Sequence, residues 1–175
     1  MEEPASPYVQ YYNRGVNKEI IFFTSDNYLL LIRKLTEYIK EYQIELIAFC
    51  LMPNHYHILL KHENQNDGSK LIQRLFNSYT QAINKRYSRV GTLFQGNVKK
   101  RFIEDDDYLA ETIKYIHLNP VKAGLCDKPE NWEYSDYREW IGLDETIRNI
   151  SVERDNIFGS TKDYEELINF EYQKF

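Results

Sequence analysis

The sequence predicts an antiparallel α+β fold. Residues 44–52 form a continuous apolar run, Pro53-Asn54 is a turn signal, and residues 55–61 alternate between apolar and polar, which together predict a β-hairpin. Apolar residues recur at helical spacing in long segments before and after this hairpin. Because the predicted strands and helices do not alternate strictly, an antiparallel sheet with helices packed on it is favoured over a parallel sheet.

The N-terminal part is predicted to begin as β structure and to continue as a helix. Residues 9–23 are rich in aromatic and β-branched side chains around a break at 13–15, which predicts a strand, a turn and a short second strand. The polar residues 24–26 are candidate N-caps. The apolar spacing that follows them predicts a helix to about residue 41.

The segments after the hairpin are predicted to be loop, helix and strand. Residues 63–68 are polar and end in glycine, so they are expected to form a loop. Residues 69–86 carry apolar side chains at helical spacing and predict a long, basic, amphipathic helix. Residues 91–103, with Gly96 inside them, predict a strand pair or one irregular strand.

The last predicted elements are two helices separated by an irregular region. Two aspartates are candidate caps for a helix over residues 107–118. Pro120 disfavours helical backbone at the residue before it, so it is expected to mark the end of that helix. Residues 132–175 are less regular, with a terminal helix expected over residues 163–175.

Composition favours a globular protein with one main domain. With 42% hydrophobic residues over 175 positions, the chain suits one domain at residues 8–140, with an acidic C-terminal extension, 141–175, packed on it. Cys50 and Cys126 give no disulfide framework, and Cys50 is expected to be buried in its apolar run. Residues 1–7 lack the apolar core of a signal peptide and no stretch approaches ~20 apolar residues, so a cytoplasmic protein without a membrane span is expected.

Charge is distributed unevenly along the chain, although the formal net charge is −5. Residues 69–103 contain eight basic residues and no acidic one, whereas residues 126–175 contain 13 acidic and six basic residues. The basic stretch suits a phosphate-binding surface next to an acidic tail. It suits a solvated helix face equally, with compensating acids elsewhere in the fold.

A His-x-His motif lies on the second strand of the predicted hairpin. Residues i and i+2 of a strand point to the same face, about 6–7 Å apart along the chain, so His55 and His57 can converge on one divalent ion. Tyr56 and Ile58 then point toward the core. A lone His-x-His also suits two half-buried imidazoles that bond to neighbouring groups.

A second motif combines a phenol and a carboxamide on one helix. Tyr115 and Asn119 are four residues apart, which places them on one helix face about 6 Å apart. His117 lies near the opposite face and is assigned a structural role. The tyrosine and the asparagine indicate a function only when they are considered together with the two histidines.

Together these groups suit attack on a phosphodiester. A tyrosine can act as the nucleophile while a metal withdraws charge from the phosphate oxygens. A free phenol has a pKa of about 10, so only about one in a thousand is ionised at neutral pH, and a nearby cation offsets part of that deficit. The resulting phosphotyrosine stores the bond energy, so a 3′-hydroxyl can later reverse the attack and rejoin strands without ATP.

Four ordered motifs resemble those of the HUH single-tyrosine transposases, and more closely those of the REP-associated branch. They are Asn13-Arg14-Gly15, the CLMPNHYHILL segment at 50–60, the GTLFQG segment at 91–96 and the YIHLNPVKAGL segment at 115–125. With the aromatic segment at 132–140, the resemblance covers roughly residues 8–140. The motifs are specific as a set, because they occur in family-like order and spacing.

The resemblance implies an RRM- or ferredoxin-like antiparallel sheet with flanking helices. It implies that His55, His57 and Asn119 are ligands of Mg²⁺ or Mn²⁺, and that Tyr115 attacks DNA and becomes linked to a 5′-phosphate. The expected substrate is a hairpin-forming repeat with a nearby single-stranded cleavage site. The expected oligomeric state is a monomer or a homodimer.

The basic residues provide candidates for contacts to the DNA backbone, which position DNA without reading its sequence. The first candidates are Arg14, Lys99, Lys100 and Arg101, and the second are Lys70, Arg74, Lys85 and Arg86. For any one of them, a solvated charge is an equally good interpretation.

Three functions remain open from the sequence. The leading hypothesis is cleavage and transfer of single-stranded DNA. The second is a catalytically silent, domesticated binder of structured single-stranded DNA, which the basic stretch and aromatics would serve equally well. The third is a metal hydrolase whose histidines activate water, and that enzyme would need no tyrosine.

Overall fold

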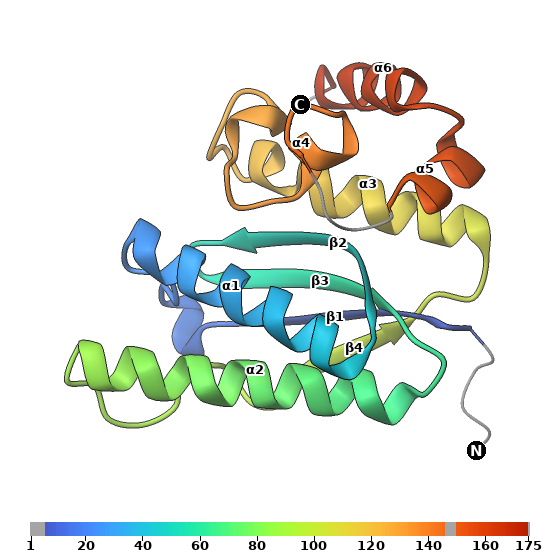
Figure 1. The fold of residues 1–175 in the computed structure, drawn as a ribbon. Coiled ribbons are helices and arrows are strands. Elements are labelled where there is room, and N and C mark those ends of the chain that lie inside the picture. The colour runs from blue at the N-terminus through green and yellow to red at the C-terminus, as the bar shows by residue number, and fades with distance from the viewer. Residues whose placement is uncertain (1–5, 146–149, 175) are drawn as a thin grey trace.

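Four strands form one antiparallel sheet in the computed structural model, which describes residues 6–145 and 150–174 (Figure 1). The strands are β1 (Tyr8–Arg14), β2 (Glu45–Met52), β3 (His55–Lys61) and β4 (Lys99–Phe102). Their order in the sheet is β2-β3-β1-β4, and each neighbouring pair is antiparallel. The predicted hairpin and the predicted ferredoxin-like α+β fold are therefore confirmed.

Two helices cover one face of the sheet. They are α1 (Ser25–Tyr42) and α2 (Gln65–Arg86), which lie side by side; in Figure 1, α1 crosses the strands and α2 runs below them. Their apolar faces pack on strand residues that include Tyr11, Tyr56 and Ile58, all at most 1% exposed. Tyr56 and Ile58 thus point into the core, as the alternation along the hairpin predicted.

The opposite face carries α3 (Asp106–Lys122), which packs against β2. The chain then forms a 3-10 turn, η2 (Pro129–Asn131), and the helices α4 (Tyr137–Trp140), α5 (Ser151–Phe158) and α6 (Thr161–Tyr172). They build a second core in which Tyr164 and Ile168 of α6 are fully buried with Ile116 of α3. The expected terminal helix thus begins and ends earlier than predicted, and Phe175 lies outside the described residues. The buried thiol of Cys50 belongs to this core, as predicted.

The prediction of a short strand after β1 is wrong. The chain forms a 3-10 turn, η1 (Val16–Lys18), and then approaches the hairpin turn, where the N–H groups of Ile21 and Phe22 both donate to the Pro53 carbonyl. Both side chains are buried in the core. The β-branched and aromatic pattern of this segment therefore reflects burial without strand pairing.

The long helix begins earlier than predicted, and Gly68 lies inside it, packed against His62 and Tyr11. Helix α2 starts at Gln65, with the Asn64 side chain accepting a hydrogen bond from the N–H of Asn66. A Cβ atom at Gly68 would lie 2.7 Å from the Tyr11 hydroxyl and 2.4 Å from Nε2 of His62. Glycine here is a packing residue inside a helix rather than the loop signal that the sequence suggested.

Pro120 does not end α3, contrary to prediction. The helix continues to Lys122, and the carbonyls of Asn119 and Pro120 accept hydrogen bonds from the N–H groups of Ala123 and Leu125. Pro120 is buried in this last turn. Proline lacks a backbone N–H and therefore removes one hydrogen bond, but the carbonyl groups at and before it still accept bonds from the turn that follows.

The predicted β structure at residues 91–103 is reduced to β4. Only Lys99–Phe102 pair along β1, whereas Phe94 makes an isolated bridge to Gly15. The region after residue 132 is more helical than predicted, with three helices in its described part. None of the helices formed by described residues is long and apolar enough to cross a lipid bilayer.

Candidate active site

The two histidines of the hairpin face the side of the sheet that α3 covers. His55 and His57 alternate with the core residues Tyr56 and Ile58 along β3. Their ring centroids are 5.3 Å apart and the rings are edge to face. His57 is 7% exposed and His55 is half-buried, so the pair lies at the wall of a cleft rather than on a free surface.

Helix α3 brings the phenol and the carboxamide of its own chain to this pair. The ring of Tyr115 meets the ring of His57 edge-on at a centroid distance of 5.2 Å. Asn119 is 8% exposed, and its side chain is hydrogen-bonded to His55. Tyr115 remains 44% exposed, so a polymer can reach it. The structure therefore brings together the four residues that the sequence analysis selected.

The other nitrogen of each imidazole is held by a carboxamide. His55 Nδ1 donates to Asn54 Oδ1 at 2.7 Å, and the Gln10 carboxamide lies 3.3 Å from His57 Nδ1. The atom of Gln10 that faces the ring is its amide nitrogen Nε2, which donates to Nδ1. A flip of this carboxamide would turn its oxygen to Nδ1, put the ring proton there and leave Nε2 with a lone pair for a metal. The Asn54 contact places the proton of His55 on Nδ1, so the Nε2 side of that ring faces Asn119.

The residues fit a divalent cation. Among the described residues, His57 Nε2 is a buried imidazole nitrogen that has no hydrogen-bond partner. Buried polar atoms without partners are rare and mark sites of strain, catalysis or an absent ion. Two imidazoles and a carboxamide form a donor set with room for phosphate oxygens. No third histidine, cysteine or carboxylate joins them within the described part of the chain.

The electrostatic environment keeps the imidazoles uncharged. Burial lowers the pKa of His55. Burial, with smaller effects from His55 and Arg101, lowers the pKa of His57 to about 3. Both rings are therefore neutral at pH 7, which is the form that binds a metal.

A pocket of about 480 Å³ opens beside the histidine pair and is lined by Tyr115 and by basic residues. Arg14, Lys18 and Lys99 line it together with both histidines. The register of the sheet places Lys99 opposite Tyr12 and Arg101 opposite Gln10, on the histidine face, whereas Lys100 pairs with core residue Tyr11 on the other face. The predicted basic run 99–101 is thus divided between the two faces.

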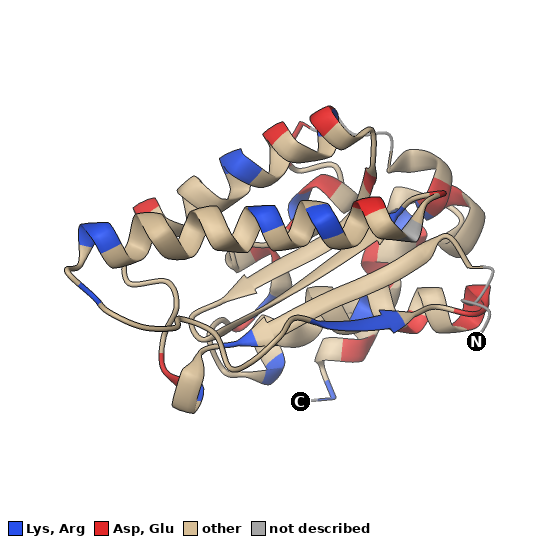
Figure 2. Cartoon of the chain, turned by 90° about the horizontal axis from the view of Figure 1, so that it is seen from below, with Lys and Arg blue, Asp and Glu red and all other residues tan. Residues whose placement is uncertain are grey.

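The second group of predicted DNA contacts lies on the other side of the sheet. Lys70, Arg74, Lys85 and Arg86 are on α2. Figure 2 looks onto this helix and shows Lys and Arg along it and along β4. Ion pairs connect Lys70 to Asp67, Arg74 to Glu41 and Arg86 to Asp26. These residues are therefore separated from Tyr115 by the sheet.

Sequence reasoning missed several residues of the site. Asn54 adjoins the histidine motif, so the need for a partner at the second ring nitrogen could have indicated it. Gln10 carries no such signal, because it is 47 residues from His57 in the chain. Lys122 lies 5.7 Å from the centre of the Tyr115 ring, and its spacing of seven residues on one helix could have indicated it.

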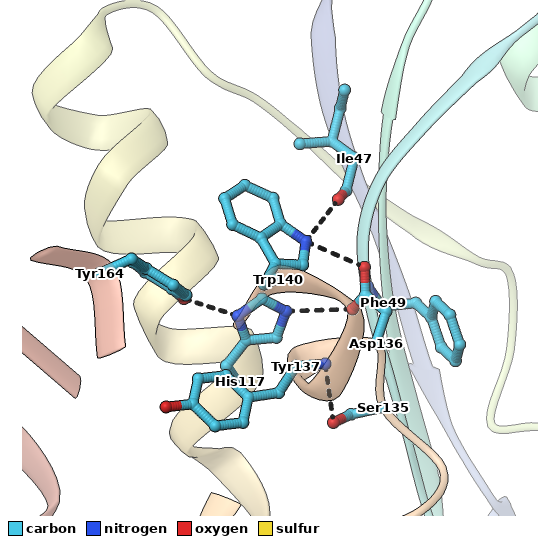
Figure 3. Close-up of polar contacts among 8 residues, drawn as sticks. All are labelled: Ile47, Phe49, His117, Ser135, Asp136, Tyr137, Trp140 and Tyr164. Atoms are coloured by element: carbon cyan, nitrogen blue, oxygen red, sulfur yellow. Dashed lines mark hydrogen bonds and ion pairs between the residues drawn. The ribbon is translucent and has the colours of Figure 1, made fainter. Parts of the chain in front are cut away.

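A buried polar network supports the helix that carries Tyr115 (Figure 3). His117 is fully buried, and its Nε2 donates to Asp136 Oδ1 at 3.0 Å while its Nδ1 accepts from the Tyr164 hydroxyl at 2.6 Å. Asp136 also accepts from the Phe49 N–H and from Trp140 Nε1. The structural role predicted for His117 is confirmed, since the network joins α3 to β2, α4 and α6.

Comparisons with known proteins identify relatives over much of the chain. Residues 16–119 match the family model described as "Transposase IS200 like". A Haemophilus influenzae protein named as a candidate REP-associated tyrosine transposase is 29% identical over 124 residues, which cover 59% of this chain and 70% of that protein.

The fold has a counterpart among solved structures. The structure of a REP-associated tyrosine transposase bound to a REP hairpin matches with a TM-score of 0.67 and 16% identity, over 86% of this chain and 90% of that chain. At this identity, the likeness supports the fold.

Proposed function

Because this chain belongs to the IS200-like transposase family, we propose that it cuts and rejoins single-stranded DNA with Tyr115 as the nucleophile. The observation that carries the proposal is the exposed phenol of Tyr115 against the ring of His57. A protein that only binds DNA needs neither a half-exposed tyrosine nor two neutral imidazoles at that place.

The proposed reaction exchanges one phosphoester bond for another. The Tyr115 oxygen loses its proton and attacks the phosphorus, the bond between phosphorus and the 3′-oxygen breaks, and the upstream strand leaves as a 3′-hydroxyl. The downstream strand stays on Tyr115 through its 5′-phosphate. A 3′-hydroxyl that enters later reverses these steps and joins the strands, so no nucleotide cofactor is consumed.

His55, His57 and Asn119 would hold Mg²⁺ or Mn²⁺, which would withdraw negative charge from the phosphate oxygens during the attack. The chain itself positions the reactants. Asn54 and Gln10 orient the two rings, and α3 holds Tyr115 beside them. Arg14, Lys18 and Lys99 line the same pocket and bind the backbone of the strand.

The proposed substrate is a hairpin-forming repeat with a single-stranded cleavage site. The structural relative was solved with a REP hairpin, and the basic pocket beside Tyr115 suits the adjoining unpaired strand. We assign this activity to residues 8–140. Residues 141–175 form the extension whose described helices pack on α3.

A covalent adduct provides the test. The protein is incubated with Mn²⁺ and hairpin oligonucleotides that carry single-stranded tails and a label at either end. A 3′-label is expected to move onto the protein in a denaturing gel, whereas a 5′-label is expected on a shorter free fragment. Tyr115→Phe is expected to abolish the adduct and to leave DNA binding within about twofold, because it removes one hydroxyl from an exposed ring.

A second tyrosine supplies the matched control. Tyr12 lines the same pocket and stacks on His57 at 6.0 Å, so Tyr12→Phe is expected to retain the adduct. An adduct that survives Tyr115→Phe and disappears in Tyr12→Phe overturns the choice of nucleophile. Binding without cleavage for all substrates would favour the silent binder, and cleavage without any adduct would favour the metal hydrolase.

A further inference from the structure

A second pocket, of about 310 Å³, opens beside Tyr115. Of the described residues, Tyr115 is the one that lines both this pocket and the pocket of the histidine pair. Both pockets are therefore reached at the same nucleophile, but only the first contains the histidines. A DNA strand that is cut at Tyr115 continues past it in both directions, and this second pocket is on the side of Tyr115 away from the first.

Basic side chains from two elements line the second pocket. Arg101 comes from β4, and Lys114 and Lys122 come from α3, two helical turns apart. Lys114 is 15% exposed and is paired with Glu111, while Lys122 lies 5.7 Å from the Tyr115 ring centre. One partly buried and two exposed cations beside the proposed nucleophile suit a phosphate better than a neutral group.

A carboxylate of the C-terminal helix lies in this pocket. Glu171 of α6 lines it and is bonded to Lys174 at 3.1 Å. Lys174, followed by Lys114 and Lys122, lowers the pKa of Glu171. The pocket thus already holds a carboxylate of the chain itself, which shares its lining with Lys114 and with Lys122 beside Tyr115.

We propose that this pocket binds a second backbone phosphate of the cleaved strand, next to the one that is cut, and that Glu171 competes with this phosphate for Lys122 and Lys114. The proposal rests on the function proposed above and adds a subsite to it. It also gives one residue of the acidic extension a role in setting the affinity for DNA.

The first experiment measures the affinity for a hairpin oligonucleotide with single-stranded tails by fluorescence anisotropy, in the Tyr115→Phe protein so that cutting does not interfere. Glu171→Gln is expected to tighten binding about two- to fivefold, the size of one partly exposed ion pair. Lys122→Gln is expected to weaken binding of different tail sequences equally and to reduce the slope of log K against log salt by about 0.7 to 1.

Coupling between the two variants tests whether they act at one place. The gain from Glu171→Gln is expected to shrink in the Lys122→Gln background, because Glu171 and the phosphate compete for Lys122. Glu166→Gln is the matched control, since it removes an exposed charge that pairs with Lys162 elsewhere on α6. If Glu171→Gln tightens DNA binding no more than Glu166→Gln does, the proposed subsite is wrong. It is also wrong if the gain in affinity from Glu171→Gln is the same with and without Lys122.

A second experiment locates the phosphate. Once the adduct assay has mapped the cut, single uncharged methylphosphonate linkages are placed at each position flanking it. At one flanking position, the methylphosphonate is expected to weaken DNA binding when Lys122 is present. In the Lys122→Gln variant, the same linkage is expected to have no further effect. If the effects of the linkage and of Lys122→Gln add fully at every position, the proposed subsite is wrong. That result would not bear on the covalent adduct, which tests the proposed function separately. Failure of all variants to bind DNA would overturn the proposed function as well.

Discussion

At the scale of single residues, the site depends on side chains that hold the two imidazoles in place. His55 and His57 are each held at Nδ1 by a carboxamide, from Asn54 and Gln10. Such contacts fix the tautomer and the orientation of a metal-binding imidazole. The geometry of the pair is therefore set by β1 and by the hairpin turn as much as by β3 itself.

Gln10 allows a direct test of this orientation. Gln10→Leu removes the carboxamide that holds His57 at Nδ1, so it is expected to weaken Mn²⁺ binding about 10- to 100-fold. Gln10→Glu keeps an oxygen at that place and is expected to retain most of the affinity. Titration calorimetry with Mn²⁺ measures both. If the leucine variant folds normally and binds Mn²⁺ as tightly as the wild type, Gln10 does not orient the ring.

The residues that could be predicted from the sequence are those with a local spacing signal. His55 and His57 follow strand alternation, and Tyr115 and Asn119 follow the helical repeat. Each spacing fixes a shared face, and the family resemblance joined the two pairs. Gln10 could not be predicted in this way, because only the pairing of β1 with β3 brings it to His57.

At the scale of elements, α3 has two functional sides. Tyr115 and Asn119 face the histidine pair, whereas His117 enters the network of Asp136 and Tyr164 (Figure 3). The buried network fixes the rotation of the helix about its axis, since turning the helix would leave buried polar atoms without partners. Through this contact, α6 helps to position Tyr115, the proposed nucleophile.

Two buried tyrosines test the network against each other. Tyr164→Phe leaves His117 Nδ1 buried without a donor and is expected to lower the free energy of unfolding by about 1–3 kcal/mol. Tyr137 is also fully buried, but its hydroxyl has no hydrogen-bond partner among the described residues. Tyr137→Phe is therefore expected to be neutral or stabilising. Urea unfolding measures both, and equal losses would contradict this assignment.

Element boundaries were harder to predict than the elements themselves. Gly68 and Pro120 carry strong local signals for a loop and for a helix end, and both lie inside helices. Tertiary packing explains the difference. Gly68 gives the Tyr11 hydroxyl and His62 room to approach the helix backbone. Pro120 is buried in the last helical turn, and its own carbonyl still accepts a hydrogen bond from the N–H of Leu125.

At the scale of the whole molecule, the C-terminal extension is attached to the sheet by charge as well as by its apolar core. Lys61 at the end of β3 donates to Glu153 of α5 at 2.7 Å, and Glu153 is 5% exposed. The same lysine lies 3.5 Å from Glu45 of β2. One cation therefore bridges two strands and the extension.

Removing this cation tests the attachment. Lys61→Met leaves the buried Glu153 carboxylate without its partner and is expected to lower the free energy of unfolding by about 1–3 kcal/mol. Lys162→Met removes an exposed helical pair with Glu166 and is expected to cost less than about 0.5 kcal/mol. Thermal unfolding at equal ionic strength measures both. Equal shifts would mean that the Lys61–Glu153 pair contributes no more than a surface contact.

The open border of the sheet has a consequence for how DNA enters. Helix α3 packs against β2, while Lys99 and Arg101 on edge strand β4 remain exposed and Tyr115 lies between the two. Under the proposed function, single-stranded DNA is therefore expected to enter sideways, without threading of a free end. Circular single strands, and long strands folded on both flanks, are then expected to reach the phenol as readily as a short linear fragment.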